Sequence, residues 1–261
     1  MSDKPFLVTL LPSTDVDLGR WLLQHWQMPY TEHPHAPLFH ILALAWYGQG
    51  KDDYPLLVTD TEKVPTIEKL VARFDAHAPP ENRLVPDAKT EKALHDEVME
   101  RQHYFRWEMG NGTVDWAYYT LLPLKNLTWP SFTTGVPWWE KAFVAAAYPV
   151  IRFGMTKGLG LNAEVALQGL TAVRKGFDQV DALLADGRAY LVGERLTLAD
   201  LAFCASAAPV VLEERYGGHL PRIEDVPLAM AKVIREFRER PAGAFINRIY
   251  AEERRPMSVR S

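Results

Sequence analysis

Cysteine is almost absent from this chain of 261 residues, which contains only Cys204. A single thiol excludes an intramolecular disulfide and a zinc site built from thiolates. This usage is typical of a reducing compartment, and the first residues lack the long apolar core of a signal peptide. We therefore expect a cytoplasmic protein.

Long apolar runs and basic stripes are missing as well. The longest apolar run, residues 41–47, is far shorter than the ~20 residues needed to cross a bilayer. The net charge is −4, and the dense basic cluster lies at the C-terminus, where acidic residues interrupt it: Arg248, Arg254, Arg255 and Arg260. We interpret this cluster as a solvated tail. The composition therefore predicts neither a membrane partner nor a nucleic-acid partner.

The first 75 residues alternate between short apolar runs and helical periodicity. Runs bounded by proline and turn residues predict strands, and apolar residues spaced three or four apart predict helices. The expected order is β-α-β-α-β-β-α, over residues 6–11, 15–28, 30–35, 38–47, 54–58, 63–64 and 66–74. A proline-rich linker follows at residues 78–86.

Almost everything after the linker has helical periodicity. The expected helices cover residues 90–109, 115–122, 138–152, 162–186, 197–208, 226–239 and 241–252. We expect a break at Gly110–Gly112, an irregular aromatic segment at 125–137, and a kink or break at Pro149, because proline removes a helical hydrogen bond. The pattern contains no internal repeat.

The most specific local signal is a helix start at Thr197. Thr197 and Asp200 have the spacing of a capping box, and Leu196 and Leu201 can form the hydrophobic staple around it. The following residues are apolar on all sides, so this helix should be buried and should need its cap from its own side chains. We therefore interpret Asp200 as a structural cap and not as a catalytic acid.

The segment YLVGERLTLADLAF, residues 190–203, resembles the G-x-x-(hydrophobic)-(S/T)-x-A-D segment in the helical domain of glutathione transferases. Arg240-Pro241-Ala242 resembles the start of a late helix in the same family. The resemblance implies an α/β thioredoxin-like, glutathione-binding domain over residues 1–77. It also implies an all-helical C-terminal domain over residues 88–261.

The resemblance also implies where glutathione would bind. Pro55 occupies the place of a cis proline, whose preceding residue, here Tyr54, pairs its backbone with the ligand. Thr66, with Ile67 after it, occupies the helix start that holds the γ-glutamyl end. Pro65 stands where the family has an acidic residue, so we expect weak binding. Taken from the residues alone, Thr66 could equally be a plain N-cap.

Ser13 occupies the position whose hydroxyl or thiol activates glutathione in the family. A free thiol with a pKa near ~8.5 is only ~3% thiolate at pH 7, and a hydroxyl donor beside a helix N-terminus could lower that pKa by roughly two units. The alternative is that Ser13 is only a turn residue. Because Cys204 is on a core helix, disulfide chemistry is disfavoured.

Several aromatic residues lie on the first helices after the linker, on a segment that faces the cleft in the family. Tyr104, Trp107 and Tyr118 are the candidates for a hydrophobic acceptor pocket, although they could also belong to the core or to an interface. Three histidines, His33, His35 and His40, match no standard zinc pattern, so we expect no metal site.

Two hypotheses follow from these residues and the resemblance. The first is a transferase, with glutathione as co-substrate, that conjugates the glutathione thiolate to an apolar small-molecule electrophile. The second is a non-catalytic binding or scaffold protein of the same fold, since fold alone does not fix function. The resemblance also implies a homodimer.

Overall fold

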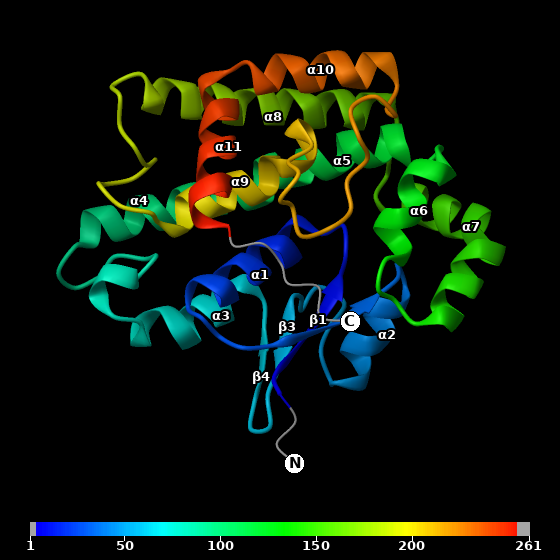
Figure 1. Cartoon of the computed structure of the whole chain (residues 1–261), viewed down its shortest axis with the longest axis horizontal. Coiled ribbons are helices and arrows are strands. Elements are labelled where there is room, and N and C mark those ends of the chain that lie inside the picture. Colours follow the sequence, from blue (N-terminus) through cyan, green and yellow to red (C-terminus); the bar gives the residue numbers. More distant parts are fainter. Residues whose placement is uncertain (1–3, 255–261) are drawn as a thin grey trace.

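The computed structural model describes residues 4–254. A small α/β part occupies the lower half of Figure 1, and helices stack above it. All four strands lie between Phe6 and Pro65, and from Lys92 onward the regular elements of the described chain are helical. The predicted fold class, an α/β thioredoxin-like part followed by an all-helical part, is confirmed.

The four strands form one mixed sheet in the order β2-β1-β3-β4. They are β1 (Phe6–Leu10), β2 (Thr31–His35), β3 (Leu56–Val58) and β4 (Lys63–Pro65). β1 and β2 pair in parallel, whereas β3 is antiparallel to both β1 and β4. The parallel pair needs a crossover helix, and α1 (Thr14–His25) supplies it.

Helices cover both faces of the sheet because its residues alternate in direction. Leu7 and Leu57 face α1 and α3 (Ile67–Phe74), whereas Val8 and Leu56 face α2 (Phe39–Trp46). Two short 3₁₀ turns, η1 (Asp75–His77) and η2 (Pro80–Asn82), lead out of this part.

The helical part begins with a long, nearly continuous rod. It consists of α4 (Lys92–His103), a π-helical turn η3 (Tyr104–Met109) and α5 (Gly110–Leu121). The remaining helices are α6 (Lys125–Thr133), α7 (Trp138–Gly158), α8 (Ala163–Leu184), α9 (Leu198–Val211), α10 (Leu228–Arg238) and α11 (Pro241–Glu253). Figure 1 shows α6 and α7 set apart from the main helical stack, beside α2.

α9 is the centre of the helical core, and every one of its residues is buried. The predicted capping box is present at its start. The Asp200 carboxylate accepts from the backbone N–H of Thr197 and from that of Leu191, both at 2.7 Å, and from the Thr197 hydroxyl at 2.7 Å. Burial raises the pKa of Asp200 to about 6, yet the side chain is fully enclosed and its bonds are structural.

Asp200→Ala should therefore lower the free energy of unfolding by about 2–4 kcal/mol, because it removes a cap and leaves two buried N–H groups without an acceptor. Urea unfolding followed by circular dichroism measures this. Activity per folded molecule should not change. Full stability combined with lost activity would reverse the structural assignment of Asp200.

The predicted break at Gly110–Gly112 is wrong, because α5 runs through these residues. The glycines serve close packing instead: a Cβ at Gly112 would lie 2.6 Å from the Gly169 carbonyl oxygen, and one at Gly169 would lie 2.7 Å from that of Gly112. α5 and α8 can therefore approach until their backbones touch.

The expectation of an irregular segment at 125–137 is also wrong, and no break occurs at Pro149. The segment predicted to be irregular forms the helix α6, which buries Phe132 and Thr128. α7 continues through Pro149 without interruption. Proline leaves the carbonyl four residues earlier without its helical donor, and the Lys125 ammonium donates to that carbonyl, on Ala145, at 3.2 Å.

The prediction of a solvated basic tail fails at Arg254, which is 4% exposed. Its guanidinium donates to the buried Asp17 carboxylate at 2.5 Å, and Asp17 also accepts from the Tyr250 hydroxyl at 3.0 Å and from the Gly217 N–H at 2.8 Å. These hydrogen bonds connect α1 to the end of the helical part. Arg255 and Arg260 lie outside the described residues.

Candidate functional site

Ser13 caps the start of α1. Its side-chain oxygen accepts from the backbone N–H of Val16 at 3.3 Å, and its own N–H donates to the Leu10 carbonyl at 3.0 Å. The capping bond uses a lone pair of the oxygen and not the hydroxyl proton. The hydroxyl is half-buried, so its proton can be donated to a group that approaches the helix N-terminus.

The peptide bond between Tyr54 and Pro55 is cis, as predicted. The Pro55 carbonyl accepts from the Thr66 N–H at 3.0 Å, and the Pro55 ring lies against α1 at Gly19, where a Cβ would be 2.6 Å from Pro55 Cγ. These contacts hold the start of α3 and the cis proline close to α1.

Thr66 is the N-cap of α3, and its hydroxyl accepts from the Lys69 N–H at 3.5 Å. Its φ of 62° is in a region that β-branched residues rarely adopt, at a cost of about 1–3 kcal/mol, and the surrounding bonds hold it there. The Ile67 side chain is completely buried in the core, so only its main chain could meet a ligand.

A buried arginine connects the starts of α1 and α3 to the helical part. Arg106, on the π-helical turn, donates to both Asp15 oxygens at 2.9 and 3.0 Å and to Glu68 Oε1 at 2.5 Å. Burial alone would raise the pKa of Glu68, but the charge and hydrogen bond of Arg106 lower it. Glu68 is therefore an anion, partly exposed, at the N-terminal end of α3.

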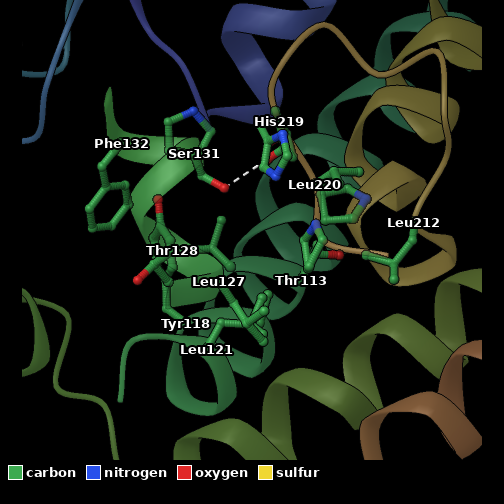
Figure 2. Close-up of a pocket in the computed structure, with 16 residues that line it drawn as sticks. Thr113, Tyr118, Leu121, Leu127, Thr128, Ser131, Phe132, Leu212, His219 and Leu220 are labelled. Carbon is green, nitrogen blue, oxygen red and sulfur yellow. Dashed lines mark hydrogen bonds between the residues drawn. The ribbon is translucent and has the colours of Figure 1, made fainter. Parts of the chain in front are cut away.

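An apolar pocket of about 50 Å³ lies beside the N-terminus of α1. Figure 2 shows its lining from α5, α6 and the loop between α9 and α10. The lining residues are Pro12, Thr14, Thr113, Val114, Ala117, Tyr118, Leu121, Leu127, Thr128, Ser131, Phe132, Pro209, Leu212, His219, Leu220 and Pro221. Pro12 and Thr14 flank Ser13, so the pocket borders the turn that carries Ser13, although Ser13 itself does not line it.

The pocket has few polar groups. The hydroxyl of Thr113 is buried and has no hydrogen-bond partner among the described residues. Burial lowers the pKa of His219, which favours the uncharged form of its ring. The Ser131 hydroxyl donates to the His219 carbonyl at 2.8 Å, the bond drawn in Figure 2, and this fixes α6 to the loop.

The loop between α9 and α10, residues 212–227, also contacts the turn that carries Ser13. The Tyr216 hydroxyl donates to the Pro12 carbonyl at 3.1 Å, and a Cβ at Gly218 would lie 2.4 Å from the Leu11 carbonyl oxygen. Only glycine permits that approach. One loop thus lines the pocket and supports the turn.

The three aromatic residues expected in an acceptor pocket do not come together. Tyr118 lines the apolar pocket, and its burial raises the pKa of its hydroxyl. Tyr104 lies instead in a separate hollow beside Gln179 on α8, and Trp107 is 46% exposed beside Arg106. The structure therefore places one of the three in this pocket.

Sequence reasoning missed Arg106 and most of the pocket lining. Arg106 was one of many charged residues on a periodic helix, and its partners are 91 and 38 residues away. The loop residues His219, Leu220 and Pro221 belong to no motif. Only the tertiary contacts of that loop reveal their position.

The histidines near the sheet contact other side chains of the fold. His35 Nδ1 is 2.7 Å from the buried Glu140 carboxylate, and His33 stacks on Phe6. Among residues 4–254, no group of three or more His, Cys, Asp or Glu side chains is arranged to hold a metal ion. The same residues contain no helix that is long and apolar enough to cross a membrane.

Comparison with known proteins supports the resemblance. Residues 145–231 match the family model of the glutathione S-transferase C-terminal domain. A glutathione S-transferase from Sinorhizobium meliloti has a similar structure (16% identity, TM-score 0.51, covering 98% of this chain and 95% of that one). No curated protein matches the sequence significantly.

Two further solved structures show the same fold. The β-etherase from a Sphingobium species has 15% identity and a TM-score of 0.55, with 93% of this chain and 98% of that one covered. A glutathione S-transferase from Methylobacterium radiotolerans, in complex with glutathione sulfonate, has 13% identity and a TM-score of 0.51, with 92% and 93% covered.

Proposed function

Because this chain has the glutathione-transferase fold and carries a C-terminal domain of that superfamily, we propose that it conjugates glutathione to an apolar electrophile. The observation that carries the proposal is the apolar pocket whose lining residues Pro12 and Thr14 flank Ser13. An electrophile in this pocket would lie next to a thiol held at the N-terminus of α1.

In this proposal residues 1–77 form the glutathione-binding domain and residues 88–261 the helical domain. The Tyr54 backbone before Pro55 pairs with the cysteinyl part of glutathione, and Thr66 and the main chain of Ile67 receive the γ-glutamyl carboxylate at the positive end of α3. The proposal extends to a cytoplasmic homodimer, the state that the family resemblance implies.

Glu68 replaces the acidic residue that is missing at Pro65. It is two residues after Thr66, partly exposed, and kept ionised by Arg106, which engages one of its oxygens. The second oxygen would accept from the α-amino group of the γ-glutamyl end. This gives the glutamyl group both an anion and a helix N-terminus to bind.

The Ser13 hydroxyl donates to the glutathione sulfur and stabilises the thiolate, while the thiol proton leaves to solvent. The thiolate then forms a carbon–sulfur bond with the electrophile, whose leaving group departs or whose added electron pair takes a proton. The buried Thr113 hydroxyl would donate to a carbonyl or nitro oxygen on that electrophile. Holding both reactants side by side supplies much of the acceleration.

Isothermal titration with glutathione, followed by conjugation assays with apolar electrophiles, tests the proposal. Saturable heat together with turnover is expected, and a tight Kd would support Glu68 as the replacement for the acid missing at Pro65. If millimolar glutathione gives neither heat nor competition, the transferase proposal fails. Binding without turnover of any electrophile would favour the binding-protein alternative.

Glu68→Gln should weaken glutathione binding about 10- to 100-fold, because a charged hydrogen bond to the amino group is lost. The same titration measures it. Glu62→Gln is the matched control, since Glu62 pairs with the exposed Arg73 and not with Arg106. Equal binding by the two variants would remove Glu68 from the site.

A further inference from the structure

α7 buries only one narrow stripe of its surface. Glu140, Val144, Tyr148 and Ile151 face inward, and most of the remaining residues of the helix are exposed. An exposed helix face in a globular protein normally carries polar and charged residues. The outward face of α7 does not.

The outward face of α7 carries large apolar side chains. They are Trp138, Trp139, Phe143, Val150 and Phe153, with exposures of 79%, 47%, 47%, 71% and 64%. At 3.6 residues per turn these side chains and the small residues between them span an arc of about 140°. The one charged residue in this arc is Lys157 in the last turn, whose ammonium lies over the Phe153 ring.

α2 extends this apolar surface. Phe39 packs edge-on against both Trp139 and Phe143, so the two helices are neighbours, as Figure 1 also shows. On α2, Leu42 is 64% exposed and Trp46 is 86% exposed. With about 150–250 Å² for a whole aromatic side chain, the two helices expose on the order of 1,000 Å² of apolar surface. The largest patch on a typical monomer is about 300–600 Å².

The exposed charged side chains of α7 itself are all positive, although the chain has a net charge of −4 and the exposed Asp52 follows α2. Lys141 and Arg152 lie within about 20° of each other around α7, at one border of the apolar arc. The acidic residue of α7, Glu140, is completely buried and accepts from the Ala36 N–H at 2.7 Å. It therefore adds no acidic side chain to the outer surface.

We propose that the outward faces of α7 and α2 bind the surface of an anionic lipid bilayer, with α7 lying in the plane of the interface. Tryptophan and phenylalanine on one face with lysine and arginine at its border are typical of interfacial helices. A second copy of the chain fits less well, because its α7 offers no exposed acidic side chain to pair with these cations.

This surface differs from the spanning segment that the sequence analysis sought and did not find. A helix that lies in the interface needs an apolar arc and not an apolar run of ~20 residues. The pocket lies close to this surface, because α6 lines the pocket and packs against α7. Electrophiles dissolved in the bilayer would then be concentrated near the site.

Flotation of the full chain with vesicles tests the proposal. Vesicles of phosphatidylcholine with one third phosphatidylserine should bind the protein, and phosphatidylcholine alone should bind it far less. Lys141→Glu combined with Arg152→Glu should weaken binding at least about 25-fold, because each cation near an anionic surface contributes about fivefold. Raising the salt concentration should also release the protein.

Val150→Asp combined with Phe153→Asp should abolish binding without unfolding the protein, because both side chains are exposed. The matched control is Leu228→Asp with Ala229→Asp on α10, which lies away from α7 in Figure 1 and exposes both residues. Circular dichroism checks the fold, and glutathione titration shows whether the proposed function stands independently.

Three results would overturn the proposal. The first is no binding to anionic vesicles at low salt. The second is that the variant with Val150→Asp and Phe153→Asp and the α10 control lose vesicle binding equally. The third is a dimer in sedimentation that Val150→Asp with Phe153→Asp converts to a monomer, since this face would then be a subunit interface.

Discussion

Ser13→Ala is expected to slow conjugation about 25-fold at pH 7, whereas the Kd for glutathione should rise only about fourfold. A free thiol is ~3% thiolate at this pH, whereas a pKa lowered by roughly two units gives about 75% thiolate. The hydroxyl acts on the sulfur, and the other contacts of glutathione remain. Stopped-flow conjugation and titration calorimetry measure the two quantities separately.

Two further variants, Ser13→Gly and Thr66→Ala, show whether the loss of activity comes from the missing hydroxyl. Ser13 is also the N-cap of α1, and alanine at a cap costs about 0.5–2 kcal/mol of stability, whereas glycine costs only a few tenths. Ser13→Gly should therefore lose as much activity as Ser13→Ala but keep its stability. Thr66→Ala should show the opposite pattern, with weaker binding and nearly normal turnover at saturation.

The pH profile gives a further signature of the Ser13 hydroxyl. In the natural protein the rate should rise with pH through about 6.5, as the lowered thiol pKa is passed, and in Ser13→Ala it should rise through about 8.5. The two rates should therefore converge near pH 9. Parallel profiles at all pH values would mean that Ser13 does not set the thiolate population.

Asp17→Asn should destabilise the fold by about 3–5 kcal/mol, the largest stability effect that we expect from a single substitution. Asp17 is fully buried and compensates the guanidinium of Arg254, which is itself 4% exposed. Asparagine keeps the shape and removes the charge, which leaves Arg254 without its anion. Arg20, 4.0 Å from Asp17, retains Glu32 at 2.9 Å.

Urea unfolding at pH 7 measures the effect of Asp17→Asn. Asp186→Asn is the control, because Asp186 forms an exposed pair with Arg188 and should leave the unfolding curve unchanged. A loss below about 1 kcal/mol for Asp17→Asn would mean that water or other groups compensate the buried arginine.

The sequence could predict those parts of the fold that local rules determine. The cap at Asp200 and the cis bond before Pro55 depend on residues near in sequence or on a family position, and both are present. Gly112 and Pro149 misled the prediction, because their usual effects on helices are overridden by distant partners. The close packing of Gly112 against Gly169 explains the first case, and the hydrogen bond from Lys125 to the carbonyl left free by Pro149 explains the second.

The residues of the candidate site also fall into those that the sequence could indicate and those that it could not. Ser13, Tyr54 and Thr66 could be named because each stands at a fixed point of the fold, the end of a strand or the start of a helix. Arg106 could not, since its importance arises only when α1 and α3 approach the π-helical turn. Of the three aromatic residues proposed for an acceptor pocket, Tyr118 lines the apolar pocket, whose other lining residues the sequence analysis did not name.

Under the proposed function, the loop that follows α9 limits how this protein could acquire a new substrate. Tyr216 and Gly218 support the turn before Ser13, while Leu212 and His219 line the pocket. A substitution in this loop that suits a different electrophile would also shift the turn that holds the thiol. Divergence of specificity should therefore proceed through the α6 wall, where side chains can vary without moving the nucleophile.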